Sequence, residues 1–361
     1  YNMDGKIDLA IANYTSHTIS VLFGTGTGTF LPSVYYSLDY ITGGGPVSLT
    51  SADFNGDTKN DIAVANEFGD NISILLNNGV GIFNDTLIYG AGHSPAWITS
   101  DDFNGDGKTD LVVTNLKDNS CSILLSKGGG SFLAPPNYYP GYGEFLSISK
   151  NDFNGDTFLD LAITNYTDTT FSILLNDGVG NFSKGTYKGG IQAEALASAD
   201  FNADGKPDII TGPDYYTGHF NIYLNNGTGG FNSIANHFYV GTNNSTIVTS
   251  DFNGDGMSDI AVNNSVGIAV FLATGLATFS TANTYSFSAI NAQMTVLDFN
   301  ADGKLDIAVG VGNGFSLLQN NGFGGFISGS TYNLGFIQTI GITSGDFNND
   351  GFIDLAVIDK N

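Results

Sequence analysis

The stretch that decides the fold is Asp102–Asp110, which reads DFNGDGKTD. Its side-chain oxygen donors fall at positions 1, 3, 5 and 9 of a short loop, and Lys108 at position 7 offers a backbone carbonyl. Such a set on a tight turn suits Ca²⁺, which takes six to eight oxygen ligands. Gly107, at position 6, supplies the positive φ that the turn requires. The apolar residues 111–114 that follow predict a strand rather than the exiting helix of an EF-hand.

This loop recurs along the whole chain of 361 residues. The complete copies begin at Asp53, Asp102, Asp152, Asp200, Asp251, Asp298 and Asp346, and a truncated copy lies at 2–8. A fixed period near 49 residues is typical of a propeller or a repeat array. Residues 46–95 divide into four short β-prone segments separated by Gly/Asn turns, which predicts one four-stranded antiparallel blade. Because no segment has a helical apolar period, we predict essentially no helix.

A second recurring feature is a glycine-rich turn after the third strand, such as NNGVGIF at 77–83. Each copy ends on a phenylalanine: Phe30, Phe83, Phe132, Phe182, Phe231, Phe279 and Phe326. We expect these rings to pack blade against blade, contributing about 2 kcal/mol or more for each ring that is fully buried.

The repeated D-F-N-G-D-G-x-x-D loop, the D-[IL]-A-V strand and the N-x-G-x-G-x-F turn together resemble the FG-GAP repeats of integrin α-subunit propellers and the related VCBS repeats of secreted, lectin-like propellers. The resemblance covers the whole chain and implies a β-propeller with structural Ca²⁺. It implies little about activity, because the family includes adhesion modules, sugar-binding lectins and enzyme-associated domains. The single domain 1–361 then divides into repeats at 1–45, 46–95, 96–144, 145–192, 193–243, 244–290, 291–336 and 337–361.

The expected fold is all-β: a seven-bladed β-propeller of four-stranded antiparallel blades. The repeats supply one strand more than seven blades need. A strand over 338–345 can complete the blade begun at the N-terminus, which leaves one second strand surplus. Three outcomes are open. The surplus strand dangles or doubles up, the chain is part of an eight-bladed or longer array, or the strand pairs with a neighbouring molecule and links protomers head to tail.

The predicted Ca²⁺ ligands are the side chains at positions 1, 3, 5 and 9, and we expect seven or eight structural ions. They are Asn2, Asp4, Asp8, Asp53, Asn55, Asp57, Asp61, Asp102, Asn104, Asp106, Asp110, Asp152, Asn154, Asp156, Asp160, Asp200, Asn202, Asp204, Asp208, Asp251, Asn253, Asp255, Asp259, Asp298, Asn300, Asp302, Asp306, Asp346, Asn348, Asp350 and Asp354. The alternative is an Asx-rich turn without an ion, in which the carboxylates repel at about 1 kcal/mol per pair even in water. Thr58 and Thr157 replace the position-6 glycine, so strain is expected there.

The formal charge of the chain is −24, from 35 acidic and 11 basic residues. The loops hold 23 of the acids, two in the first copy and three in each of the seven others. All the basic residues are lysines, which argues against a nucleic-acid partner. No apolar run is long enough for membrane insertion. The single cysteine, Cys121, is expected to be a buried small hydrophobe.

Loops alternate between two faces in antiparallel blades, so the Ca²⁺ loops and the Phe turns should share one face. The other face is rich in tyrosine and histidine, and it is the predicted surface for a protein or glycan ligand. Its candidates are Tyr36, Tyr40, His93, Tyr139, Tyr142, Tyr216 and His219. The alternative is that most of these rings cover the edges of outer strands. Trp97, at the start of an inner strand, is expected in the core.

Asn-x-Ser/Thr sequons predict a secreted, N-glycosylated chain. They begin at Asn13, Asn71, Asn84, Asn165, Asn181, Asn226, Asn243, Asn244 and Asn263. Because the chain is rich in Asn and Thr, some of them are chance matches.

The sequence has no G-x-S-x-G elbow and no zinc-type histidine spacing, so we expect no catalytic residues and no enzyme. The leading expectation is an extracellular, calcium-stabilised module for adhesion or assembly. The alternative is a carbohydrate-binding, lectin-type propeller. A polysaccharide lyase or hydrolase is the least favoured, because no convergent set of bases is visible.

Overall fold

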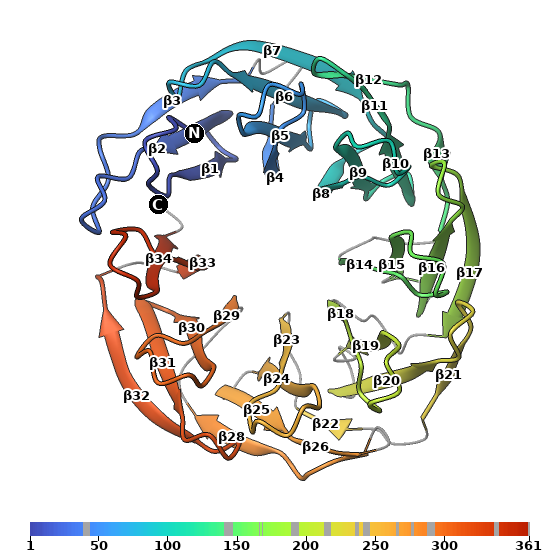
Figure 1. Cartoon of the computed structure of the whole chain (residues 1–361), viewed down its shortest axis with the longest axis vertical. Coiled ribbons are helices and arrows are strands. Elements are labelled where there is room, and N and C mark those ends of the chain that lie inside the picture. The colour runs from blue at the N-terminus through green and yellow to red at the C-terminus, as the bar shows by residue number, and fades with distance from the viewer. Residues whose placement is uncertain are drawn as a thin grey trace.

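The computed structural model describes residues 1–38, 44–140, 147–165, 167, 169–188, 195–212, 218–234, 238–240, 246–264, 267–275, 278–286, 293–335 and 339–359. In these residues the regular structure is entirely β-strand, as predicted. They include no helix long and apolar enough to cross a membrane. The strands form a ring of sheets around a central axis (Figure 1).

The strands fall into one sheet per repeat. The first sheet contains β1 (Leu9–Asn13), β2 (Thr18–Leu22) and β3 (Val34–Ser37). The second contains β4 (Pro46–Ala52), β5 (Asp61–Asn66), β6 (Asn71–Asn77) and β7 (Phe83–Gly90). The third contains β8 (Pro95–Asp101), β9 (Asp110–Asn115), β10 (Ser120–Leu124) and β13 (Asn137–Tyr138), and the fourth β14 (Ile148–Asn151), β15 (Asp160–Asn165), β16 (Thr170–Asn176) and β17 (Phe182–Lys188).

The fifth sheet contains β18 (Ala195–Ala199), β19 (Asp208–Gly212), β20 (His219–Asn225), β21 (Phe231–Ser233) and β22 (Phe238–Tyr239). The sixth contains β23 (Ile247–Ser250), β24 (Asp259–Asn264), β25 (Gly267–Phe271) and β28 (Asn283–Ser286). The seventh contains β29 (Met294–Leu297), β30 (Asp306–Val311), β31 (Gly314–Asn320) and β32 (Phe326–Asn333), and the eighth β33 (Thr339–Gly345) and β34 (Asp354–Asp359). Small hairpins lie in two of the glycine-rich turns: β11 (Ser126–Gly128) with β12 (Ser131–Phe132), and β26 (Ala273–Gly275) with β27 (Thr278–Phe279).

Neighbouring strands within each sheet are antiparallel. In the second sheet, for example, Thr50 pairs with Ala63, and Ala63 pairs with Ile74. Every residue of the second strands β5, β9, β15 and β30 is buried. Both faces of a blade pack against other blades, so these strands are apolar on both sides instead of alternating. The first strand of each blade faces the central axis (Figure 1).

The hydrophobic core lies between the blades. Each cluster of buried apolar side chains in the described part of the chain draws on two neighbouring repeats. Of the predicted turn phenylalanines, Phe83, Phe132, Phe182, Phe231 and Phe326 are buried, which confirms their packing role. Cys121 is fully buried, as expected.

A second phenylalanine, at loop position 2, is also buried, and the sequence analysis did not predict its role. Phe54, for example, is only 1% exposed and packs edge-on against Phe132 of the next repeat, with ring centroids 6.1 Å apart. The same contact joins Phe103 to Phe182, Phe153 to Phe231, Phe201 to Phe279 and Phe252 to Phe326. Each candidate metal loop, the name kept below for the D-F-N-G-D-G-x-x-D loops, therefore packs through its second residue against the glycine-rich turn of the following repeat.

The closure of the ring differs from the expected seven blades. β33 pairs with β34, β1 pairs with β2, and no backbone pairing among the described residues joins these two sheets. Sheets of blade type therefore number eight in the described part of the chain, with the first and last incomplete. The reason is local: a short loop connects β33 to β34, so they pair as the first two strands of every complete repeat do. The all-β propeller is confirmed, and the eight-bladed alternative describes these sheets better.

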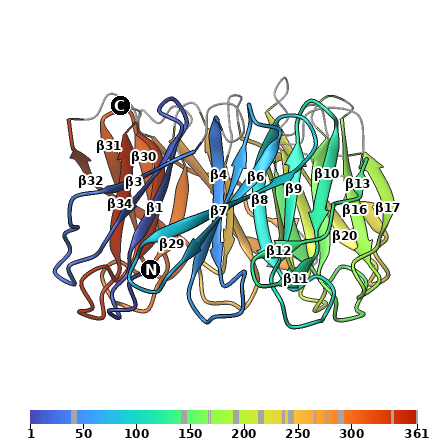
Figure 2. The same ribbon diagram turned by 90° about the horizontal axis from the view of Figure 1, so that it is seen from above.

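The two rims of the ring carry different loops (Figure 2). The N–H of Gly130, in a glycine-rich turn, donates to the carbonyl oxygen of Phe54, in a metal loop, at 3.1 Å. The predicted sharing of one face by metal loops and Phe turns is thus confirmed. This rim is the lower one in Figure 2, where β11 and β12 are labelled.

Candidate metal centres

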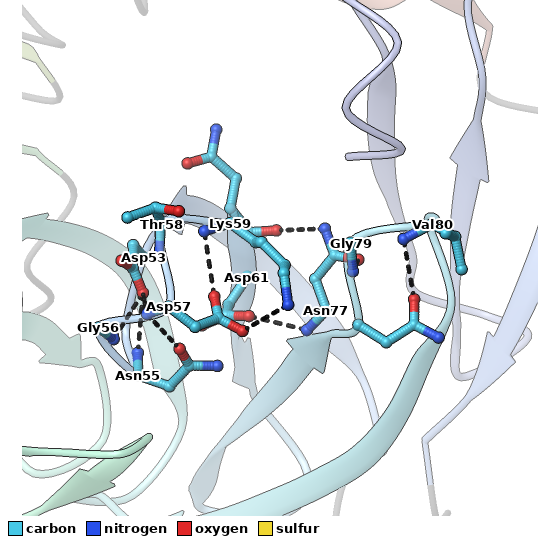
Figure 3. Close-up of polar contacts among 12 residues, drawn as sticks. Asp53, Asn55, Gly56, Asp57, Thr58, Lys59, Asp61, Asn77, Gly79 and Val80 are labelled. Atoms are coloured by element: carbon cyan, nitrogen blue, oxygen red, sulfur yellow. Dashed lines mark hydrogen bonds and ion pairs between the residues drawn. The ribbon is translucent and has the colours of Figure 1, made fainter.

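The loop Asp53–Asp61 shows how position 1 shapes each loop (Figure 3). Asp53 Oδ1 accepts hydrogen bonds from the N–H groups of residues 55–57, at 3.2, 2.7 and 3.1 Å. Its Oδ2 accepts one from the N–H of Thr58 at 2.7 Å. The bond from position 6 to position 1 recurs in every complete loop. The backbone therefore wraps around the first carboxylate, as in an Asx turn.

Position 9 is a buried anchor. Asp61 is 0% exposed, and its Oδ2 accepts a hydrogen bond from the N–H of Phe54 at 3.0 Å. Its Oδ1 accepts one from the N–H of Asn77 at 2.8 Å. Burial raises the pKa of Asp61 to about 6 against these two bonds, and the carboxylates at positions 5 and 1 add to the rise. The pKa is raised to about 6 in the same way at Asp110, Asp160, Asp208 and Asp259.

The loops differ in whether the aspartate at position 5 pairs with a lysine. In five loops a lysine at position 7 pairs with the position-5 aspartate. These pairs are Lys6–Asp4, Lys59–Asp57, Lys108–Asp106, Lys206–Asp204 and Lys304–Asp302, with Nζ to Oδ2 distances from 2.7 to 3.5 Å. The hydrogen bond from Lys108 holds the pKa of Asp106 below its usual value. The other loops have Phe158, Met257 and Phe352 at position 7, so no lysine of the same loop pairs with their position-5 aspartate.

The strain predicted for the two threonine-containing loops is present. Thr58 has a φ of 66° and Thr157 a φ of 77°, close to the 79° of Gly107 at the same loop position. Their N–H groups still donate to the first aspartate, at 2.7 and 2.8 Å. The loop geometry is therefore kept at the cost of a β-branched residue in the left-handed region.

The donor chemistry of the loops fits a hard cation. Positions 1, 3 and 5 place carboxylate and amide oxygens on one turn, which is the ligand type that Ca²⁺ prefers. In the described part of the chain, however, no three carboxylate, imidazole or thiolate groups converge on one point. The position-9 carboxylate is directed at two backbone amides, and position 5 is directed at lysine in five loops. The truncated first copy keeps the hydrogen bond between position 9 and the glycine-rich turn, since Asp8 Oδ1 accepts a hydrogen bond from Gly24 N–H at 2.8 Å.

The first asparagine of the glycine-rich turn is a structural residue that the sequence analysis missed. In the fifth repeat, the N–H of Asn225 donates to Asp208 Oδ1 at 2.8 Å. Its Nδ2 donates to the carbonyl oxygen of Phe153, in the preceding repeat, at 2.9 Å. Asn176 and Asn320 make equivalent contacts. The N-x-G-x-G-x-F motif contained this signal, because an asparagine there can donate and accept at once.

Tyr36 does not lie on the predicted ligand face. Its ring packs edge-on against Phe83 with centroids 5.2 Å apart, and its hydroxyl donates to Gly81 O at 2.9 Å. Both partners belong to the glycine-rich turn of the metal-loop rim. Tyr36 is therefore a contact between blades, as the alternative interpretation of these tyrosines holds.

The other ligand-face candidates are dispersed. His93 Nδ1 lies 2.7 Å from Asp70 Oδ2, and this hydrogen bond raises the pKa of His93. Tyr139 is 61% exposed, and the His219 ring packs edge-on against the Tyr239 ring. Tyr40, Tyr142 and Tyr216 lie outside the described residues.

The expectation that Trp97 is a core residue is wrong. Its side chain is 47% exposed. The reason is its place on the innermost strand β8, where Ile98 is buried against the preceding blade and Trp97, the residue before it, borders a cavity between its own blade and the next.

The sequons divide by exposure. Asn71, Asn165 and Asn263 are buried, at 6%, 1% and 2% exposure, and their prediction as acceptors is corrected because a glycan requires an accessible amide. Asn13 is half-buried and donates to two hydroxyl groups. Asn181 and Asn226 are exposed in turns and stay predictions. The side chain of Asn84 and the residues Asn243 and Asn244 lie outside the described part.

The fold and its loops define a β-propeller built from repeats that each carry an Asp/Asn-rich loop between the first two strands. A family model described as FG-GAP-like repeat matches residues 1–64, 53–113, 152–211, 200–262, 251–309 and 298–357. The chain belongs to this FG-GAP-like repeat family. No curated protein sequence matches it.

Solved structures share the fold along nearly the whole chain. A lectin of Agrocybe aegerita that recognises non-reducing terminal N-acetylglucosamine matches at 19% identity and a TM-score of 0.58, covering 98% of this chain and 95% of the lectin. A periplasmic gluconolactonase of Pseudomonas aeruginosa matches at 15% identity and a TM-score of 0.58, covering 97% of this chain and 98% of that protein. At these identities the likeness shows the shared fold alone.

The expectation that the chain is not an enzyme is contradicted by these comparisons. Besides the gluconolactonase, a protein of Bacteroides uniformis described as a candidate 6-phosphogluconolactonase matches at 14% identity and a TM-score of 0.61, over 90% of this chain and 95% of that protein. The missing serine elbow and zinc spacing exclude only two kinds of active site, whereas propellers of this shape include a lactonase. The exclusion of an enzyme is therefore withdrawn.

Proposed function

We propose that this protein is a secreted, calcium-stabilised propeller that serves as an extracellular adhesion or assembly module. The observation that carries the proposal is the repeated aspartate at position 9, whose pKa is raised by burial and further by repulsion from the carboxylates at positions 5 and 1 of the same loop. A bound cation would remove this repulsion. The ions would occupy the loops whose side chains are named above, seven or eight in all.

Calcium bound in these loops would stiffen the contacts between blades. Each loop joins the first two strands of a blade, and its second residue packs against the turn of the next blade, as Phe54 packs against Phe132. Fixing one loop therefore fixes two repeats. Secretion is supported by the exposed sequons Asn181 and Asn226.

Calorimetric melting of the protein, first freed of divalent ions, tests this proposal. Each Ca²⁺ that binds only the folded state should add about 2.7 kcal/mol at a 100-fold excess over its Kd. We expect a large, saturable rise in Tm with Ca²⁺, and a smaller rise with Mg²⁺, which demands a near-ideal octahedral site. Identical melting in Ca²⁺ and in excess chelator would refute the proposal.

A second candidate function is carbohydrate binding. Exposed aromatic side chains such as Tyr139 and Tyr239, at 61% and 64% exposure, favour it, since aromatic rings present a flat apolar face to sugars. The Agrocybe aegerita lectin of the same fold recognises N-acetylglucosamine. Binding to a glycan array that is lost on Tyr139→Ala and Tyr239→Ala would support this candidate, and an array without signal would reject it.

A further inference from the structure

Trp97 is the only tryptophan of the chain, and blade packing does not explain it. It lies in the inner strand β8, five residues before the first aspartate of its loop. The residues at the same distance from the other six complete loops are Ser48, Ser147, Ala195, Thr246, Gln293 and Gly341. Since small or polar residues occupy this place elsewhere, the fold does not require a large aromatic ring here.

A cavity of about 250 Å³ opens beside the Trp97 ring. Trp97, Ile98 and Thr99 line it from one blade, and Ser147 and Ile148 line it from the next. The inner strands of these two blades, β8 and β14, face the central axis of the ring (Figure 1). The cavity thus lies between adjacent blades at the axis and is distinct from the metal-loop rim.

The walls of the cavity are held in place by hydrogen bonds within each blade. The N–H of Trp97 donates to Thr114 Oγ1 at 3.2 Å, and the N–H of Ser147 donates to Thr164 Oγ1 at 3.1 Å. Of the two hydroxyl-bearing residues in the lining, Thr99 is the one left for a ligand, because the Ser147 hydroxyl donates to Leu196 O at 3.4 Å and accepts from Leu196 N–H at 3.3 Å in the following blade. A rigid wall with one aromatic face and a few polar groups is what a small-molecule site requires.

The charges near this cavity cancel. Further along the same two strands, Lys150 Nζ lies 2.6 Å from Asp101 Oδ2 and also donates to Ser100 O at 2.8 Å. The chain as a whole carries a charge of −24, which disfavours anionic ligands. A ligand at Trp97 should therefore be neutral, with an apolar face for the indole and a hydroxyl group for the Thr99 side chain.

We infer that this cavity binds a single neutral pyranose ring, stacked on the indole of Trp97 and hydrogen-bonded by Thr99. The volume suits one sugar ring, because the sites of drug-sized ligands occupy roughly 300 to 1,000 Å³. This inference rests on the second candidate function, carbohydrate binding, and does not depend on calcium.

The single tryptophan provides a direct readout. The intact protein is titrated with the methyl glycosides of glucose, galactose, mannose and N-acetylglucosamine, with tryptophan emission and calorimetry followed in parallel. We expect at least one glycoside to shift the emission saturably. Thr99→Val keeps the shape and the fluorophore, and it should weaken binding roughly tenfold through the lost hydrogen bond.

Trp97→Ser installs the residue found at the equivalent places 48 and 147, so the fold should tolerate it. Calorimetric binding of the glycoside should then be lost, whereas Phe323→Ala, which removes an exposed ring in another repeat, should bind as the wild type does. Sugar binding that survives Trp97→Ser would overturn this site but leave carbohydrate binding standing. Absence of binding to every glycoside would overturn both. Saturable quenching by choline and by no sugar would overturn the sugar assignment in favour of a cation on the indole.

Discussion

The ring of Phe347 packs edge-on against the ring of Phe30, with centroids 5.6 Å apart and planes inclined at 64°. Phe347 is position 2 of the last metal loop, and Phe30 ends the first glycine-rich turn. The contact therefore has the same form as the one between Phe252 and Phe326 of neighbouring repeats. It closes the ring between the last repeat and the first without a shared sheet.

Phe347→Ala should destabilise the protein by about 3 kcal/mol, because Phe347 is only 4% exposed and its removal leaves a cavity at the closing contact. Urea unfolding measures this loss. Phe323→Ala is the matched control, because Phe323 is 83% exposed and its loss should change stability by less than about 0.5 kcal/mol. If the two variants unfold at the same urea concentration, the Phe347–Phe30 contact does not hold the ring closed.

The sequence predicted features that are local and repeated. The strand order within a repeat, the loop positions and the turn phenylalanines each depend on residues less than one period apart. The partner of Phe54 could not be read in this way, because Phe132 lies in the next repeat and the loop motif accounts for Phe54 as part of the metal site. The contact of Asn225 with Phe153, 72 residues earlier, was missed for the same reason.

The closure of the ring and the exposure of side chains on its innermost strands depend on the three-dimensional arrangement of the blades, which no sequence pattern predicts. A count of strands cannot decide whether β33 pairs with β1 or with β34. In the structure β33 pairs with β34, because closing the short loop between them costs less conformational entropy than joining the two ends of the chain. The exposure of Trp97 follows from the cavity between its blade and the next, whereas an apolar residue in a strand ordinarily indicates burial. The metal ligands themselves stay a prediction.

Thr58→Gly should stabilise the metal-free protein by about 1 kcal/mol, because it removes the strain of a φ of 66° at a small cost in backbone entropy. Gly107→Thr is the reverse change at the same loop position. A Cβ at Gly107 would meet no atom within 4 Å, so the expected loss of about 2 kcal/mol comes from the backbone alone. Chemical denaturation of both variants measures the two effects, and changes of the same sign would contradict this account.

Lysine at position 7 should weaken cation binding in its loop. Lys108 Nζ lies 2.7 Å from Asp106 Oδ2, so Lys108→Met frees that carboxylate and should tighten Ca²⁺ roughly fivefold, for an interaction of about 1 kcal/mol. Met257→Lys makes the opposite change in a loop without lysine and should weaken it. Competition with a chromophoric chelator measures the affinity of both variants. The explanation fails if neither variant alters the competition curve, or if both alter it in the same direction.

The buried aspartates should give the metal-free protein an inverted dependence of stability on pH. Burial raises the pKa of Asp61 to about 6 in the folded state, above its ordinary value of 3.8, and four equivalent residues behave alike. A carboxyl group of this kind stabilises the fold when protonated. Its contribution is therefore fully present below a pH of about 4 and is lost as the pH rises through about 6.

The Tm of the metal-free protein should thus rise as the pH falls from about 7 to about 5. Saturating Ca²⁺ should reverse this slope, since protons compete with the cation for the same carboxylates. Asp61→Asn removes one of the titrating groups and should flatten the metal-free slope without changing its sign. Parallel slopes with and without Ca²⁺ would mean that the cation does not meet these carboxylates, and the loops would then be Asx turns that hold the blades together without an ion.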